Sequence, residues 1–148
     1  MSYGYDIIDG IEVPQMVVTK DTIINGTHNG TVHVEQGTLT IIGELDGTLD
    51  VQNSAKVVIK GKQNGTVSVN DASTVIVIGE LNGTTTVSSG GSVCVEESGK
   101  MAGTLTNYGA VIVRGVFGGA QSGHDVILEG NGYIKQPIIE DGISYYNW

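Results

Sequence analysis

The sequence contains little of what stabilises or targets many small proteins. It has one cysteine, Cys94, which excludes a disulfide bond within the chain, and only 2 prolines. Aromatic residues make up 5% of the chain, and no apolar run approaches the length that spans a membrane. The opening segment MSYGYDIIDG lacks the basic and apolar regions of a secretory signal. We therefore expect a soluble protein of the cytoplasm, with no membrane partner.

Basic residues are also scarce. The 148 residues include 7 Lys and Arg against 16 Asp and Glu, so the formal net charge is −9 at pH 7. Such a surface repels phosphate backbones and attracts a basic protein, so we expect no nucleic-acid partner. The length is sufficient for a single domain with a sizeable core.

Glycine, in contrast, is abundant, and a Gly-Thr pair recurs along the chain. The glycines of these pairs lie 17, 18, 18 and 20 residues apart, at Gly30, Gly47, Gly65, Gly83 and Gly103. Asn or Asp precedes four of them, and these residues, like glycine, tolerate a left-handed backbone. Each pair therefore predicts a corner with positive φ. The tripeptide Asn-Gly-Thr is also an acceptor for N-linked glycans. However, Asp46-Gly47 and Ala102-Gly103 occupy the equivalent position of their repeats and are not acceptors, so the recurrence is better explained by a corner than by glycosylation.

A repeat near 18 residues is typical of a solenoid. Aligned repeats place aliphatic residues in columns, and within each repeat these residues alternate with polar ones, as on a strand. Two such columns are Leu39, Val57, Val75, Val93, Val111 and Ile41, Ile59, Val77, Val95, Val113, followed by a glycine column at Gly43, Gly61, Gly79, Gly99, Gly115. The sequence predicts an all-β, single-domain parallel β-helix, or β-solenoid, of about six coils, three-sided and right-handed.

The column pattern extends past the central repeats in both directions. We expect Val17 to lie under Val34, and Thr22 and Ile24 to lie under Leu39 and Ile41. At the other end, Val126, Leu128 and Gly130 are expected to continue Val111, Val113 and Gly115. The coils are thus predicted over residues 16–132.

The two terminal segments, residues 1–15 and 133–148, differ from the coils in composition. They contain five of the 6 Tyr, the only Trp and both prolines. Pro14 and Pro137 cannot donate to a strand ladder, so these segments are interpreted as aromatic caps that protect the end strands.

The repeats IIGELDGTLDV, VIKGKQNGTVSV and IVIGELNGTTTV each hold two nearby glycines followed by alternating aliphatic residues. Over about residues 30–117 the chain resembles the bactofilins, the polymer-forming bacterial scaffolds. The resemblance implies a three-sided parallel β-helix, self-assembly and no catalysis. The chain departs from that family in its aromatic ends, its longer fourth repeat and its lack of disordered tails. A six-residue spacing of aliphatic residues is also similar to left-handed β-helix acyltransferases, but the small residue expected after each is replaced by Asp46, Gln52 or Asn64.

No group of residues indicates catalysis. His33 is expected beside Asp50 of the next coil, which is half of a metal site without a third ligand. Cys94 is expected to face outward with no histidine in its column to activate it. The sequence therefore predicts no enzyme, no catalytic residue, no cofactor and no metal.

One outward column is apolar where alternation predicts polar side chains. Val58 is expected to stack with Thr40, Ile76, Cys94 and Ile112, beside a second column that contains Ile42, Ile78 and Glu96. Either the C-terminal segment IIEDGISYYNW folds back over this face, or the face is a protein interface. The candidate interface residues are Ile42, Val58, Ile76, Ile78, Cys94 and Ile112, with the acidic residues Glu80 and Glu96 around them.

Three functions are compatible with these features. The first is a non-enzymatic acidic module of the bacterial immunity or inhibitor kind, which neutralises a basic protein partner. The second is a self-associating scaffold of the bactofilin kind. The third, a small hexapeptide-type acyltransferase, depends only on the six-residue spacing.

Overall fold

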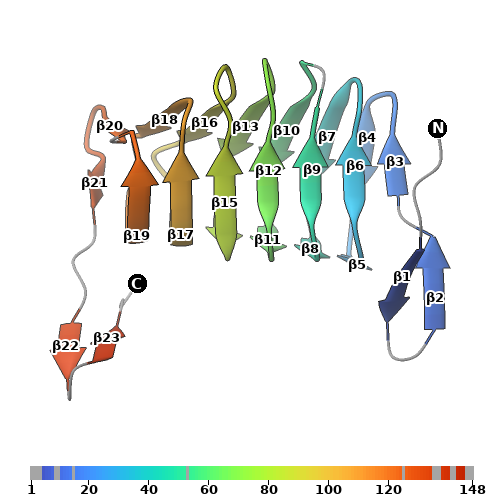
Figure 1. The fold of residues 1–148 in the computed structure, drawn as a ribbon, viewed down its shortest axis with the longest axis horizontal. Coiled ribbons are helices and arrows are strands. Elements are labelled where there is room, and N and C mark those ends of the chain that lie inside the picture. The colour runs from blue at the N-terminus through green and yellow to red at the C-terminus, as the bar shows by residue number, and fades with distance from the viewer. Residues whose placement is uncertain are drawn as a thin grey trace.

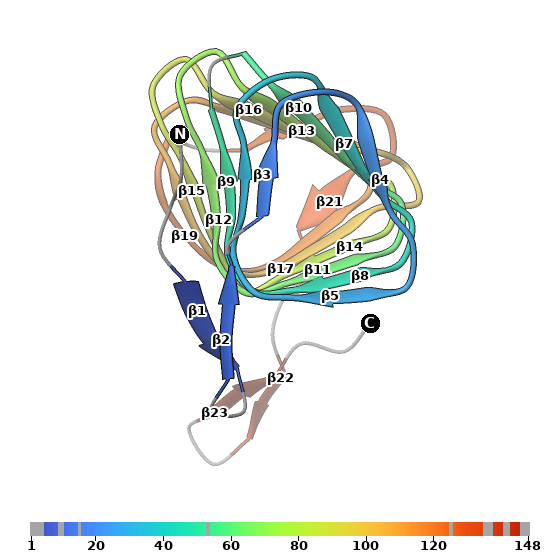
Figure 2. The ribbon, with the colours of Figure 1, turned by 90° about the vertical axis from the view of Figure 1, so that its right-hand side faces the viewer.

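The chain folds into a parallel β-solenoid of about six coils, with no helix among the residues described. This computed structural model describes residues 5–8, 11–14, 16–52, 54–124, 126–134, 138–140 and 143–145. The coils stack side by side along the long axis of the molecule (Figure 1). Viewed from the N-terminal end, the chain winds clockwise as it recedes from the viewer (Figure 2), so the solenoid is right-handed, as the sequence predicts.

The strands form three walls, which we number in the order in which a coil meets them after β3. Wall 1 is the 7-stranded sheet of β4 (Thr22–Ile24), β7 (Thr38–Ile41), β10 (Lys56–Ile59), β13 (Thr74–Val77), β16 (Ser92–Val95), β18 (Ala110–Val113) and β20 (Ile127–Leu128). Wall 2 is formed by β5 (Thr27–Asn29), β8 (Glu44–Asp46), β11 (Lys62–Asn64), β14 (Glu80–Asn82), the first halves of β17 (Lys100–Asn107) and β19 (Val116–Gly123), and β21 (Tyr133–Ile134). Wall 3 is formed by β3 (Met16–Val18), β6 (Val32–Val34), β9 (Leu49–Val51), β12 (Val67–Val69), β15 (Thr84–Val87) and the second halves of β17 and β19.

The parallel register confirms the predicted columns of the central coils. On wall 1, Val57 pairs with Leu39 and Val75, and Ile59 pairs with Ile41 and Val77. Because every coil hydrogen-bonds to the next in this register, equivalent residues stack on both sides of each wall. Thr22 and Ile24 pair with Leu39 and Ile41, also as predicted.

Two predicted positions at the ends are wrong, in each case because a corner differs in length. Val18, not Val17, pairs with Val34, since the corner after β3 is one residue shorter than the corner after β6. The pairing of Tyr133 with Val116 places Gly132, not Gly130, beside Gly115, because the corner after β20 is longer than the corner after β18. The stack also continues through β21, two residues beyond the predicted end of the coils.

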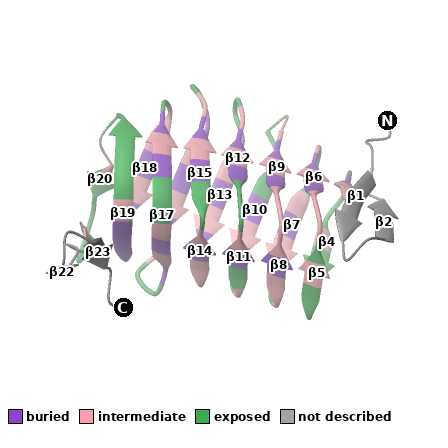
Figure 3. Ribbon diagram, turned by 60° about the horizontal axis from the view of Figure 1, so that its bottom comes forward, coloured by how far each residue is buried: buried purple, intermediate pink, exposed green. Residues whose placement is uncertain are grey.

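The core is a continuous column of aliphatic side chains inside the three walls. Buried residues recur at the same places in successive coils (Figure 3), and Val57, Ile59, Val75 and Val77 are all 0% exposed. Polar Gln63 replaces leucine in the column of Leu45 and Leu81, and its Nε2 donates to the carbonyl oxygen of Gly47 at 2.9 Å. The inward apolar stripe of each strand therefore forms one core along the solenoid axis.

The corner between walls 2 and 3 explains the recurring Gly-Thr pairs. Gly65 has a φ of 120°, and a Cβ on it would lie 2.4 Å from the carbonyl oxygen of Gly47. Beside it, Asn64 Nδ2 donates to Asp46 Oδ1 at 2.8 Å, and Asn82 Nδ2 donates to Asn64 Oδ1 at 3.1 Å. The predicted positive φ is thus confirmed, and the asparagines link successive coils through a ladder of side-chain hydrogen bonds.

Each terminal segment contains an antiparallel hairpin that pairs only within itself among the described strands. At the N-terminus β1 (Tyr5–Ile8) pairs with β2 (Ile11–Pro14), and at the C-terminus β22 (Ile138–Glu140) pairs with β23 (Ile143–Tyr145). In Figure 2 these strands lie largely outside the outline of the coils. Tyr133, assigned to the C-terminal cap, belongs instead to β21 of the stack, where it pairs with Val116 and is 52% exposed. The other aromatic side chains of the proposed caps and Pro137 lie outside the described part of the chain, so their capping role stays a prediction.

We expect Val77→Lys to unfold the protein, because it places an unpaired charge at a fully buried position in the middle of the stack. The expected loss in the free energy of unfolding is at least about 4 kcal/mol. The matched control is Ile76→Lys, which adds the same charge one residue earlier on the outward side of β13. Equal thermal stability of the two variants would show that the assigned inward face is wrong.

Gly65→Val tests the corner. A branched side chain at this positive φ would collide with the backbone of the preceding coil, so we expect a loss of about 2–4 kcal/mol in chemical denaturation. Thr66→Val, on the exposed neighbouring residue, should change stability by less than about 0.5 kcal/mol. If Gly65→Val were as stable as Thr66→Val, the close approach of successive corners would be contradicted.

Candidate functional site

The outer face of wall 1 carries the predicted apolar column. Successive coils stack, in register, Ile23, Thr40, Val58, Ile76, Cys94, Ile112 and Ile127, which together we call the apolar column. The central members are half-buried against their neighbours, whereas Ile23 is 59% exposed and Ile127 is 50% exposed. The column therefore offers a continuous apolar strip along the length of the solenoid.

The described part of the C-terminal tail does not cover this strip. In Figure 2 β22 and β23 lie below the coils, on the opposite side from β7, β10 and β13. The first of the two interpretations of the apolar column was that the C-terminal tail folds back over it. The strands β22 and β23 do not do so.

Charged groups of both signs border the apolar column. Arg114 donates to Glu96 at 3.2 Å and to Glu129 at 3.0 Å. Lys56 and Lys60 lie on the edges of the same wall, in register with Thr38 and Ile42 of the preceding coil. Because cations and carboxylates alternate here, wall 1 does not have the acidic character of the whole chain.

Cys94 is the member of the apolar column that contacts these charged groups. Its Sγ donates to Glu96 Oε1 at 3.2 Å, and Arg114 NH1 lies 3.3 Å from the sulfur. Burial and then the Glu96 carboxylate raise the pKa of Cys94, and the opposing effect of Arg114 is smaller. A thiol with a raised pKa is a poor nucleophile at neutral pH.

Of the eight candidate interface residues, the structure places seven together and separates one. Ile42, Val58, Ile76, Ile78, Cys94, Glu96 and Ile112 lie on wall 1 or at its edge. Glu80 lies instead on β14 of wall 2, in register with Lys62 and Lys100, and its carboxylate is 3.5 Å from Lys62 Nζ. The corner at Gly79 separates Glu80 from wall 1. The alternation of inward and outward residues along a strand does not reveal where such a corner turns the chain.

Wall 2 carries a ladder of alternating charge. Glu44, Lys62, Glu80 and Lys100 occupy one outward position in four successive coils. A hydrogen bond to Asp46, and repulsion by it, raise the pKa of Glu44. The opposite charges of neighbouring coils stabilise the parallel pairing, as cross-strand ion pairs do in other sheets.

Wall 3 differs from the other two because most of its outward strand positions are hydroxyls, after Val17 and His33 in its first two strands. Its strands β3, β6, β9, β12 and β15, and the second halves of β17 and β19, contain no Lys or Arg. From the second coil to the fifth the outward strand positions include Asp50, Ser68, Thr86 and Thr106. This face therefore offers hydrogen-bond acceptors without a competing cation.

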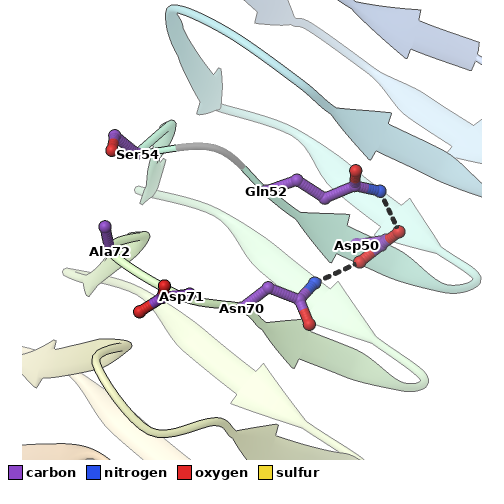
Figure 4. Close-up of a pocket in the computed structure, with 6 residues that line it drawn as sticks. All are labelled: Asp50, Gln52, Ser54, Asn70, Asp71 and Ala72. Atoms are coloured by element: carbon purple, nitrogen blue, oxygen red, sulfur yellow. Dashed lines mark hydrogen bonds between the residues drawn. The ribbon is translucent and has the colours of Figure 1, made fainter.

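A shallow hollow of about 600 Å³ opens at the corner between walls 3 and 1 (Figure 4). Its lining residues are Asp50, Gln52, Ser54, Asn70, Asp71 and Ala72. Ser54 and Ala72 have positive φ, at 65° and 61°, in the corners of two successive coils. These corners set Asp71 at the rim, exposed to solvent.

Asp50 forms the centre of a side-chain network in this hollow. Asn70 Nδ2 donates to Asp50 Oδ1 at 2.6 Å, and Gln52 Nε2 donates to Asp50 Oδ2 (Figure 4). His33 Nδ1 lies 3.1 Å from Asp50 Oδ2, so the predicted contact of His33 with Asp50 is confirmed. The network holds both amide side chains in place, with their nitrogens on Asp50.

The sequence analysis did not identify Gln52, Asn70 or Asp71. Gln52 and Asn70 each follow the last inward valine of a wall 3 strand, so their stacking could have been read from the columns. The left-handed Ser54 and Ala72 have no comparable sequence signal, because neither is a residue type that favours positive φ. Among the residues described, no three His, Cys, Asp or Glu side chains are grouped to hold a metal ion.

Comparisons with known protein families, with curated proteins and with solved structures found no match for this chain. No helix among the described residues is long and apolar enough to cross a membrane. The class that the structure defines is the right-handed parallel β-solenoid.

The Cys94 environment predicts slow alkylation by iodoacetamide in dilute protein near neutral pH, because little of the thiol is ionised. Glu96→Gln should speed the reaction, since it removes the carboxylate that raises the pKa of Cys94. Arg114→Ala should slow it, since the cation favours the thiolate. The unfolded chain supplies the reference rate, and equal rates in the three folded proteins would contradict this account.

Proposed function

We propose that the chain is a non-catalytic protein-binding module of the immunity or inhibitor kind, which neutralises a basic protein partner in the cytoplasm. The observation that carries the proposal is the uneven distribution of charge around a rigid solenoid. A free thiol such as Cys94 is compatible with a reducing compartment.

The acidic excess is compensated on two walls and not on the third. On wall 1 Arg114 pairs with both Glu96 and Glu129, and Lys56 and Lys60 add two further cations. On wall 2 Lys62 lies beside Glu80. On wall 3 the strands contribute acceptors and no Lys or Arg. A basic partner is therefore attracted most strongly to wall 3 and its corner.

The hollow between walls 3 and 1 supports this choice of face. Asp50 and Asp71 supply carboxylates, and the amide groups of Gln52 and Asn70 are held by their hydrogen bonds to Asp50. A guanidinium group prefers planar acceptors held in fixed positions, so an arginine side chain of the partner fits this lining.

An oligo-arginine peptide is a suitable probe, with its affinity measured by titration calorimetry at low and high salt. We expect Asp71→Asn to weaken binding about three- to tenfold, and added salt to weaken binding of the wild type. Glu97→Gln is the matched control, because it removes the same charge from an exposed corner between walls 1 and 2. Equal losses in the two variants would show that only net charge matters, and would overturn the assignment to the hollow.

A scaffold of the bactofilin kind is the second candidate, favoured by the stacked parallel coils and by Leu128, which is 49% exposed at the C-terminal end of a core column. Such a scaffold would add coils end to end and form filaments that lengthen with concentration, whereas a binding module stays a discrete particle. The fold does not favour the acyltransferase hypothesis, because those enzymes are left-handed β-helices and this solenoid is right-handed.

A further inference from the structure

Wall 1 has the features of a face that binds a partner, yet it does not suit a basic one. Its apolar column extends through seven strands, and Ile42 at the edge is 48% exposed. Its border contains Lys56, Lys60 and Arg114 as well as Glu96 and Glu129. The partner of this face must therefore match an apolar strip and also present charges of both signs.

We propose that wall 1 binds a second copy of this chain, with the two solenoids antiparallel, to form a symmetric dimer. The two-fold axis would run along the strand direction through Ile76, the middle member of the apolar column. A column residue that lies a given number of coils before Ile76 then faces, in the other copy, the residue that lies the same number of coils after Ile76.

This operation brings the members of the apolar column opposite one another, with Thr40 as the one hydroxyl among them. Ile76 faces its own copy, Val58 faces Cys94, Thr40 faces Ile112, and Ile23 faces Ile127. The two most exposed members, at 59% and 50%, thereby cover each other at both ends of the interface. Two aligned sheets pack in this manner when their facing sides are apolar.

The same operation matches charge. Lys60 and Glu96 occupy one edge position, one coil before and one coil after Ile78, so the Lys60 of each copy faces the Glu96 of the other. A parallel dimer, with its axis along the solenoid, would instead bring Lys56 of one copy opposite Lys60 of the other. Charge complementarity therefore selects the antiparallel arrangement.

The size of the face sets the strength of the dimer. Six spacings of about 4.8 Å by five residues of about 3.3 Å give a flat area near 400–500 Å² for each copy. This lies at the low end for specific association, so the dimer should be weak and should form with rising concentration. None of the residues that line the hollow at the corner between walls 3 and 1 belongs to the apolar column or its charged border, so the dimer and the binding of a basic partner are tested separately.

The test is sedimentation of the full chain over a range of concentrations. We expect the wild type to pass from monomer to dimer, and Ile76→Asp to stay monomeric because it places two carboxylates together at the two-fold axis. Lys60→Glu and Glu96→Lys should each weaken the dimer about tenfold or more, because each brings like charges together twice. Lys56→Glu is the control, since Lys56 faces Ser92 in this arrangement.

The decisive sample is an equimolar mixture of Lys60→Glu and Glu96→Lys. An antiparallel dimer restores both opposite-charge pairs in the mixed species, so the mixture should dimerise at concentrations at which each variant alone is mostly monomeric. Circular dichroism confirms that every variant is folded. A wild type that stays monomeric, a mixture that stays monomeric, or particles that grow beyond dimers would each overturn the proposal. None of these outcomes depends on whether oligo-arginine binds at Asp71.

Discussion

The parallel backbone ladder between successive coils is the interaction on which every other feature of this protein depends. Each wall strand hydrogen-bonds to the strand one coil before it and one coil after it, as β10 does with β7 and β13. This pairing places equivalent residues about 4.8 Å apart along the axis. A side chain is therefore surrounded by the equivalent side chains of the neighbouring coils, whether it points inward or outward.

The corners are the places where the ladder restricts the sequence most. At Gly43, Gly61 and Gly79 an added Cβ would lie about 2 Å from the glycine carbonyl oxygen of the preceding coil. No side chain fits at that distance, so the spacing of the coils itself requires glycine there. Corner length is less restricted, since the corner after β16 accommodates Glu97 and Ser98 without disturbing the pairing of β14 with β17. Loops on the surface of a solenoid can lengthen because they do not carry the ladder.

Stacking also gives the three outer faces their separate characters. Outward residues that recur at one position of the repeat form a row along one wall. The corners keep the rows of the three walls apart. Wall 1 shows an apolar line bordered by charges of both signs, and wall 2 shows alternating charges. Wall 3 shows mainly hydroxyls, with amides and carboxylates at the hollow on its corner with wall 1. A net charge of −9 therefore says little about any one face. The acids that matter for a partner are those without a cation in a neighbouring coil.

The sequence by itself determined the fold class, the inward columns and the glycine corners, because each is written as a repeat near 18 residues and each depends on near neighbours. It also determined that Val58, Ile76, Cys94 and Ile112 share one outward column. Only the tertiary structure decided the lengths of the end corners, which moved Val18 and Gly132 into the columns. It also decided that Glu80 lies on a different wall from Ile76, and that Asp50, Gln52, Asn70 and Asp71 surround one hollow. These features depend on the direction in which the backbone turns at each corner, through the φ values of residues such as Ser54 and Ala72. Alternation of residue types along a strand records which side of a wall a residue faces, but it contains no information about the angle between one wall and the next.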